Sequence, residues 1–272
     1  MRSSRNKLTP GRVGIIVISS LSLTFLSLPI LALALRAIES QAWRSAPDSA
    51  IPDAIWLSFI TTAATVLLTL CFGTPLAYLF ARHQFRFKRL LNVLIELPIV
   101  LPPAVAGLAL LITFGRRGLL GPLLSSIGVS LPFSIYAVIM AQAFVAAPFY
   151  IRAAQIGFQA ISREIEDAAQ VDGASGWRLF RHITMPLAAR ALAAGTILCW
   201  ARALGEFGAT ILFAGSLQGR TQTMPLLIYN VIERDIDAAI WTGLILIALA
   251  LIALLISQGL SSTTPRQDDH QS

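Results

Sequence analysis

Charged residues are scarce in this sequence, and so are the residues that form disulfides or bind metals. Charged residues make up 13% of the 272 positions and hydrophobic residues 56%, which excludes an ordinary soluble domain. The two cysteines, Cys71 and Cys199, lie in separate apolar runs, so no disulfide framework is expected. The three histidines, His83, His182 and His270, are far apart and have no second ligand at metal spacing. A metal site is therefore not expected.

The sequence also lacks the residues with which a chain hydrolyses ATP. No GxxxxGK[ST] loop occurs, and the only lysines are Lys7 and Lys88. No nucleophile is visibly paired with a general base. We predict that the chain is not an enzyme, has no catalytic residues and binds no cofactor itself.

Long apolar runs dominate what is present. A helix needs about 20 apolar residues to cross the roughly 30 Å hydrocarbon core, and a backbone in lipid must satisfy its own hydrogen bonds. The runs do not alternate as the strands of a membrane β-barrel would. The sequence therefore predicts an all-α, polytopic membrane protein with about six transmembrane helices. The predicted spans are 13–35, 54–80, 90–114, 131–151, 187–213 and 238–256.

Lys and Arg are distributed unequally between the two sets of loops. One set, which includes both termini and loop 152–186, holds thirteen: Arg2, Arg5, Lys7, Arg12, Arg82, Arg86, Lys88, Arg89, Arg152, Arg163, Arg178, Arg181 and Arg266. The other set holds six: Arg36, Arg44, Arg116, Arg117, Arg220 and Arg234. Basic loops face the cytoplasm. We expect both termini and loop 152–186 to be cytoplasmic, and topology plus anionic lipid to explain the net charge of +7 without nucleic acid.

The N-terminal run permits two interpretations. A basic start, an apolar run and Ala32-Leu33-Ala34 could form a cleaved signal peptide, but the run is long for one, which favours a retained helix. The chain then divides into a cytoplasmic tail (1–12), a peripheral first helix with an outer loop (13–53), a core transmembrane domain (54–256) containing the cytoplasmic loop 152–186, and a second cytoplasmic tail (257–272).

The polar loop contains the most informative motif. Residues 166–186 read EDAAQVDGASGWRLFRHITMP. This spacing resembles the EAA-x3-G-x9-I-x-L-P signature of permeases of ATP-binding-cassette (ABC) importers, with aspartate for the usual glutamate and Met185 for the usual leucine. The resemblance implies a type I ABC-importer permease fold and a loop that docks on a partner ATPase. Its residues are Asp167, Ala168, Ala169, Gly173, Ser175, Trp177, Phe180, Ile183 and Pro186.

Local signals in this loop predict two short helices. Ser162 can cap a helix that starts at Arg163, and Asp172-Gly173 is a turn signal that ends it. Ser175 can cap a second helix over 176–182, in which Trp177, Phe180 and Ile183 recur every three residues as an apolar stripe. An exposed stripe needs a groove to cover it. The alternative is an amphipathic helix on the membrane surface, because Arg178 and Arg181 accompany the aromatics.

The third and fifth predicted spans contain helix-breaking or charged residues. Pro98, Pro102 and Pro103 predict either a plain kink or a broken segment that lines a polar path. In the fifth span, Arg202 and Glu206 can pair at i, i+4, either as a structural pair near the path or with Arg202 helping an anion to pass. Small residues there predict close approach of a neighbouring helix at a dimer interface. These small residues are Gly205, Gly208 and Ala209. The residues predicted to lie at the translocation path or the bundle interface are Pro102, Pro103, Arg202, Gly205, Glu206, Gly208 and Thr210.

Three further stretches resemble permeases for tetrahedral oxyanions. Residues 201–210 (ARALGEFGAT) are similar to those of molybdate, tungstate and sulfate permeases. Residues 101–107 with 114–118, and residues 219–229, resemble the molybdate/tungstate branch more than the sulfate branch. Sulfate or thiosulfate import is the alternative within the class. Because such permeases form a passage, the sequence does not distinguish molybdate from tungstate.

The resemblance also implies the partners. These are ABC ATPase subunits that hold ATP and Mg, an external oxyanion-binding protein, a second copy of the chain in a homodimer, and the lipid of a bacterial inner membrane. Arg116 and Arg117 on the outer face either snorkel or contact the binding protein. Rival classes are an autonomous secondary transporter or channel, which commonly shows paired repeats or intramembrane carboxylates, and a membrane enzyme.

Overall fold

Helices make up all the regular structure in the part of the chain that the computed structural model describes, residues 10–47 and 49–262. Their bounds are α1 (Pro10–Ser40), the 3₁₀ turn η1 (Ala42–Ser45), α2 (Ile51–Arg82), α3 (Lys88–Val100), α4 (Pro103–Phe114), α5 (Gly121–Ser126), α6 (Ile135–Gln159), α7 (Arg163–Val171), α8 (Gly176–Leu179), the π-helical turn η2 (Phe180–Thr184), α9 (Met185–Leu204), α10 (Gly208–Phe213), α11 (Met224–Ile232) and α12 (Ile236–Ser262). The predicted all-α fold class is confirmed.

Five helical segments of the described chain are long and apolar enough to cross a membrane, and a bent helix pair makes up to six. The five are Arg12–Ser40, Ile51–Arg82, Ile135–Gln159, Gly176–Leu204 and Ile236–Leu255. The predicted tails were slightly too long, since α1 begins at Pro10 and α12 runs to Ser262. The rest of the two tails, residues 1–9 and 263–272, lies outside the described residues.

Two predicted spans are broken. α3 and α4 meet at an angle of 115°, because the residue before a proline is held in an extended conformation and Leu101 and Pro102 both precede one. The fifth run does not continue to residue 213: α9 ends at Leu204, and α10 begins only at Gly208. The break in the third span is one of the two outcomes that the proline cluster predicted, whereas the prediction of a continuous fifth span to residue 213 is wrong.

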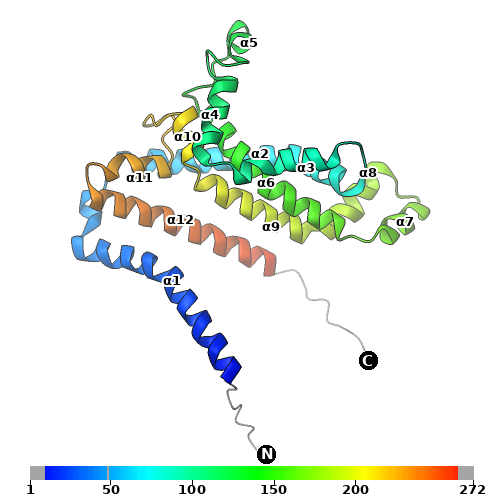
Figure 1. The fold of residues 1–272 in the computed structure, drawn as a ribbon, viewed down its shortest axis with the longest axis horizontal. Helices are drawn as coiled ribbons and strands as arrows, with labels where there is room; N and C mark the ends of the chain where they lie inside the picture. Colours follow the sequence, from blue (N-terminus) through cyan, green and yellow to red (C-terminus); the bar gives the residue numbers. More distant parts are fainter. Residues whose placement is uncertain (1–9, 48, 263–272) are drawn as a thin grey trace, which may run out of the picture.

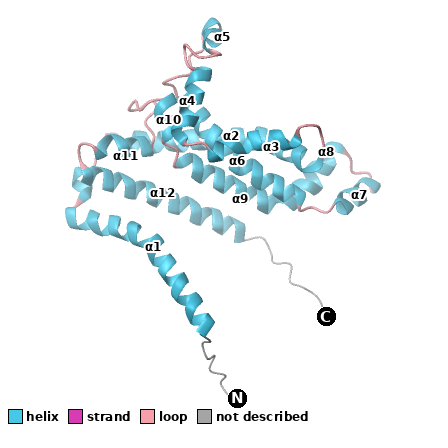
Figure 2. Ribbon diagram, in the orientation of Figure 1, coloured by secondary structure: helices cyan, strands magenta, loops and turns pink. Residues whose placement is uncertain are grey.

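The core of the bundle is formed by α2, α6 and α9, which lie side by side in Figures 1 and 2. Small residues allow the close approach. A Cβ added at Gly195 of α9 would lie 2.8 Å from the Cβ of Ala153 on α6, and one at Gly73 of α2 would lie 3.1 Å from Ile151. α2 also buries a row of hydroxyl side chains: Ser58, Thr61, Thr62, Thr65 and Thr69. Most of these hydroxyls form hydrogen bonds, either to carbonyls of α2 or to groups of α6 and α11.

The bundle has two different ends (Figure 1). α7 and α8 lie at one end, with the last turn of α2 and the first turn of α3; we call this the α7 end. α11, η1 and the start of α12 lie at the other, the α11 end. α4 and α5 project from the side of the bundle as an arm. α1 packs lightly against α12 and η1, and no residue in its apolar window is buried.

Candidate functional site

The loop at the α7 end begins as its sequence predicts. The Ser162 hydroxyl accepts a hydrogen bond of 3.2 Å from the backbone N–H of Glu164, which caps α7. α7 ends at Val171, and Gly173 follows with φ +91°, a conformation that favours glycine. A Cβ at Gly173 would meet nothing within 4 Å. The glycine is therefore required by the turn and not by packing within this chain.

The second part of the loop differs from its prediction. Ser175 makes no side-chain capping bond, and the helix that begins at Gly176 continues through η2 into α9 instead of stopping at residue 182. Pro186 lies in the first turn of α9, where it lacks an N–H and its ring crowds the carbonyl of His182. The π turn widens the helix there, with the N–H of Met185 bonded to the carbonyl of Phe180. The proline therefore follows a wide turn and does not begin a new span.

The aromatic side chains of this segment do not share one exposed stripe, which corrects the prediction for Phe180. Its ring lies 4.9 Å from that of Tyr78 and 6.2 Å from that of Phe158, so it packs into the bundle. Trp177 is 67% exposed and lies against the outer side of Phe180, with ring centroids 5.5 Å apart. Ile183 is half-buried. One aromatic anchors the segment, and the other is left on its surface.

The exposed apolar surface of the loop includes side chains that the sequence motif did not single out. Val171 is 88% exposed and Ile165 47% exposed, and both belong to α7. With Trp177 they form the loop's solvent-facing apolar group. Asp167 and Ala168 are exposed beside them, and Ala169 is half-buried. A hollow of about 390 Å³ adjoins this surface and is lined by Trp177, Phe180, Arg181, His182 and Met185.

A buried charged network fastens the loop to the bundle, and sequence reasoning missed it. The Arg82 guanidinium lies 2.9 Å from the Glu166 carboxylate, and both side chains are only 9% exposed. The Thr184 hydroxyl donates to the same carboxylate at 2.8 Å. Arg82 also donates to the carbonyl of Ile161 at 3.1 Å. Four elements (α2, the end of α6, α7 and η2) therefore meet at one ion pair.

The pairing of Arg202 with Glu206 is confirmed, but not as a pair within one helix. The two side chains lie 2.7 Å apart, with Arg202 27% and Glu206 1% exposed. Glu206 lies beyond the end of α9, and its carboxylate also accepts a hydrogen bond of 2.7 Å from the backbone N–H of Ala209. Glu206 thus holds the first turn of α10 as a capping residue does. The pair closes the break between α9 and α10.

The two helix breaks lie against each other. A Cβ at Gly208 would lie 2.7 Å from the Cβ of Pro103, and a Cβ at Gly107 would lie 2.7 Å from the Ala209 carbonyl. The close neighbour of Gly208 and Ala209 is therefore α4 of the same chain, which corrects the expectation that these small residues face a second copy. The other predicted path residues are divided: Thr210 is buried beside them, whereas Pro102 and Gly205 are exposed.

Arg116 and Arg117 lie apart from this group, on the arm between α4 and α5. Both are exposed, and Arg116 donates to the Ser130 hydroxyl at 3.4 Å. The structure therefore does not bring them near Arg202.

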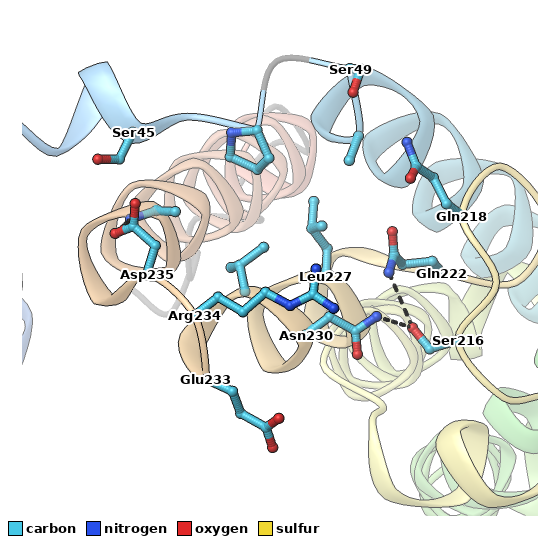
Figure 3. A pocket seen from close by; sticks show the side chains of 14 residues that line it. Ser45, Ser49, Ser216, Gln218, Gln222, Leu227, Asn230, Glu233, Arg234 and Asp235 are labelled. Carbon is cyan, nitrogen blue, oxygen red and sulfur yellow. Dashed lines mark hydrogen bonds between the residues drawn. The ribbon is translucent and has the colours of Figure 1, made fainter.

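A separate pocket of about 660 Å³ opens at the α11 end (Figure 3). The Ser216 hydroxyl accepts hydrogen bonds from the amides of Gln222 (3.2 Å) and Asn230 (2.9 Å). In Figure 3 the Arg234 side chain extends across the pocket toward Asn230, and Glu233 lies at the edge of the pocket. Asp235 accepts bonds from the N–H groups of Asp237 and Ala238 at the start of α12, and these bonds hold the pKa of its carboxyl below the usual value. The pocket is polar and of mixed charge.

Known proteins resemble this chain over most of its length. Residues 73–264 match the family described as "Binding-protein-dependent transport system inner membrane component". The molybdenum transport system permease protein ModB of Mycobacterium bovis is 40% identical over 223 residues, covering 82% of this chain and 83% of that protein. The sulfate transport system permease protein CysW of Synechococcus elongatus is 35% identical over 221 residues, covering 81% and 77% respectively.

A solved structure shares the fold. A chain of a bacterial ABC transporter involved in the import of the acidic polysaccharide alginate superposes with a TM-score of 0.74, covering 93% of this chain and 96% of that one. The sequence identity is 16%, so the likeness concerns the fold alone. It confirms the predicted permease fold.

Proposed function

The chain belongs to the family of binding-protein-dependent transport system inner membrane components, and on that premise we propose that it is the membrane-spanning subunit of an ATP-driven importer of molybdate or tungstate. It is a multi-pass transport component and not an enzyme. Relatives named as molybdenum transport permeases support the substrate, together with residues 101–107, 114–118 and 219–229. Sulfate or thiosulfate is the second candidate, supported by the likeness to a sulfate permease.

The observation that carries the proposal is the construction of the loop at the α7 end. Trp177, Val171 and Ile165 are exposed on a polar segment that a buried ion pair holds rigidly against α2. A rigid segment with an uncovered apolar group is suited to dock in a groove of a partner. We assign that groove to the ATPase subunit, which holds ATP and Mg. A helix lying on the membrane surface would not need such fastening.

The orientation and the assembly follow from this assignment. The α7 end carries Arg82, Arg86, Lys88, Arg152 and Arg163, so the excess of basic residues supports a cytoplasmic position for it and for both termini. The α11 end, with the pocket of Figure 3, then faces the external binding protein, to which Arg116 and Arg117 on the arm add positive charge. One loop per chain fits one ATPase per chain, and a homodimer supplies two of each.

Transport then takes place by alternating access between two conformations of the dimer. Closure of the ATPases displaces the docked loop. Because Arg82 joins Glu166 to the last turn of α2, we propose that this ion pair passes the displacement to the bundle. The Arg202–Glu206 pair has a structural part, closing the break between α9 and α10 near the path.

Replacement of the exposed tryptophan tests the docking assignment. The test uses the complex of this chain with its ATPase and its external binding protein (the carrier), reconstituted in liposomes. Trp177→Ala should lower carrier-stimulated ATP hydrolysis and oxyanion uptake at least tenfold. A well-packed aromatic at the centre of an interface contributes about 2 kcal/mol or more. Trp56→Ala is the matched control, because Trp56 is 65% exposed near the α11 end. Equal activity of the two variants would refute the docking role.

The substrate has its own test in the same liposomes. Carrier protein loaded with molybdate or tungstate should stimulate ATP hydrolysis, and carrier loaded with sulfate should not. Stimulation by sulfate alone would keep the importer and reject the proposed branch. Failure to form any complex with an ATPase would reject the importer.

A further inference from the structure

The short connection between α2 and α3 carries a cluster of cations without acidic partners. Arg86, Lys88 and Arg89 lie within four residues, and no acidic residue occurs from 83 to 95. In the described part of the chain none of the three forms an ion pair, whereas Arg82 is paired with Glu166 and the next acid along α3, Glu96, is paired with Arg152 at 3.2 Å. The positive charge of this connection is therefore uncompensated by the chain itself.

Two of these cations, Lys88 and Arg89, line a hollow, and the third, Arg86, lies over the ring of Phe87 beside it. Lys88 donates from its ammonium group to the His83 carbonyl at 2.9 Å, which closes the loop. Phe87 adopts φ +67°, an uncommon conformation for a bulky side chain, and is 66% exposed with the Arg86 guanidinium 5.6 Å from its ring centroid. The hollow measures about 480 Å³ and is lined by Gln84, Phe85, Phe87, Lys88, Arg89 and Asn92.

An apolar groove between α2 and α3 adjoins this hollow. It measures about 380 Å³ and is lined by Leu76, Leu79, Phe80, Phe85, Leu91, Leu94 and Ile95. Phe85 lines both spaces, and its ring stands edge-on to Phe80 with centroids 5.1 Å apart. From the ends of the helices, the groove extends about two helical turns, or roughly 10 Å, along α2 and α3. A cationic hollow and an apolar groove thus lie next to each other on either side of Phe85, and the groove extends along α2 and α3 away from their ends.

We propose that these two adjoining spaces bind one anionic phospholipid of the cytoplasmic leaflet, with its phosphate beside Lys88 and Arg89, Arg86 adding positive charge next to it, and part of an acyl chain in the groove. Basic side chains close to the membrane surface attract anionic headgroups, and an exposed aromatic ring is stable at the level of the headgroups. The site rests on the orientation proposed above, but it is independent of which oxyanion is carried. The lipid lies at the connection between α2 and α3, which follows directly after Arg82, the arginine that holds the loop at the α7 end.

Retention of lipid by the purified complex tests this site. Phosphatidylglycerol and phosphatidylcholine with identical acyl chains are added to the detergent-solubilised importer, and bound lipid is counted by native mass spectrometry. The variant Arg86→Gln, Lys88→Gln, Arg89→Gln should weaken phosphatidylglycerol binding about fivefold per charge, on the order of a hundredfold in all. The matched control is Arg116→Gln, Arg117→Gln, Arg220→Gln, which removes three exposed arginines elsewhere and should bind as the unmodified chain does.

Further arms separate the lipid from other occupants. Leu94→Trp, which fills the groove and leaves every charge in place, should weaken binding of the long-chain lipid but not of glycerol phosphate. Equal binding of the two lipids, unchanged binding in the triple variant, or displacement of the lipid by inorganic phosphate at similar concentration would overturn the proposal. Disulfide-linked chains formed from Leu94→Cys would overturn it too, because they would place a second copy over the groove.

Discussion

Among the described residues, two Arg–Glu pairs have a buried carboxylate, one at the α7 end and one nearer the α11 end, and these two pairs differ in what they connect. Arg82 and Glu166 come from α2 and α7, are equally buried, and gather the end of α6 and η2 through Ile161 and Thr184. Arg202 and Glu206 are four residues apart. Their pair connects the end of α9 only to the start of α10, and Arg202 remains partly exposed.

The difference concerns how each region holds its neighbours. At the α7 end, charged side chains connect segments that are distant in the sequence, so the loop is attached to the bundle. Near the α11 end, the charge fixes only local backbone. The connection between distant segments there is made by glycines, Gly107 and Gly208, that let α4 and α10 touch. Removing a charged side chain should therefore lower the stability of the chain more at the α7 end than at the Arg202–Glu206 pair. Adding a methyl group to a glycine should lower the stability most where α4 meets α10.

The largest effect is expected when the buried pair at the α7 end is broken. Arg82→Leu leaves the Glu166 carboxylate buried without its cation, which costs about 3–5 kcal/mol. Replacing both partners, Arg82→Leu with Glu166→Leu, removes both charges and should recover much of that loss. The measurement is thermal unfolding of the detergent-purified chain. If the double variant is as unstable as Arg82→Leu, the loss does not come from an unpaired buried charge. If Arg82→Leu is as stable as the unmodified chain, the two ends do not differ in the way argued above.

The second effect tests the glycine contact between α4 and α10. In Gly107→Ala the new Cβ would lie 2.7 Å from the Ala209 carbonyl oxygen and 2.9 Å from its Cα, and backbone yields little. Separating the two helices should cost about 2–3 kcal/mol. Gly205→Ala is the matched control, since its Cβ would meet only the Ala201 carbonyl at 3.7 Å. Both variants are compared by thermal unfolding, and equal stabilities would mean that α4 and α10 do not depend on close approach.

Local sequence signals predicted most of the helices and part of the site. Apolar runs identified the spans, Ser162 and Gly173 marked the two ends of α7, and Arg202 was matched with Glu206 because the two are neighbours on one helical turn. These features depend on a few consecutive residues. The prolines at 98–103 likewise marked a break, although not its angle.

The features that the sequence did not reveal depend on contacts between distant segments. α7 contains Glu164, Glu166 and Asp167, and nothing local shows that Glu166 is the one buried against Arg82. Phe180 and Trp177 are three residues apart, yet only packing against Tyr78 decides which of them turns inward. The sequence offered one signal for this pair. Arg82 ends an apolar run on the same predicted side of the membrane as the acid-rich loop that contains Glu166.

A smaller effect is expected at the local pair. Glu206→Gln keeps an oxygen that can accept from the Ala209 N–H but removes the charge facing Arg202. Because Arg202 is partly exposed, water can solvate it, and the expected loss is about 1–2 kcal/mol. Thermal unfolding of Glu206→Gln beside Arg82→Leu compares the two pairs directly. A loss at Glu206 equal to that at Arg82 would show that the local pair also carries long-range contacts.

The smallest effect is expected at Asp235, where the carboxylate is exposed and bonds mainly to the first turn of α12. Its ionised form accepts the N–H groups of Asp237 and Ala238, so its pKa in the folded chain lies below that in the unfolded chain, about 3.9. A group with a lowered pKa stabilises the fold above the unfolded value, and the contribution is lost as pH falls through the folded value. Asp235→Asn can still cap α12 but does not titrate. The difference in melting temperature between the unmodified chain and this variant should therefore shrink below about pH 4, since all other carboxylates are common to both. A difference that stays constant would mean that the charge at Asp235 does not contribute, and the α11 end would then be held by hydrogen bonds and packing alone.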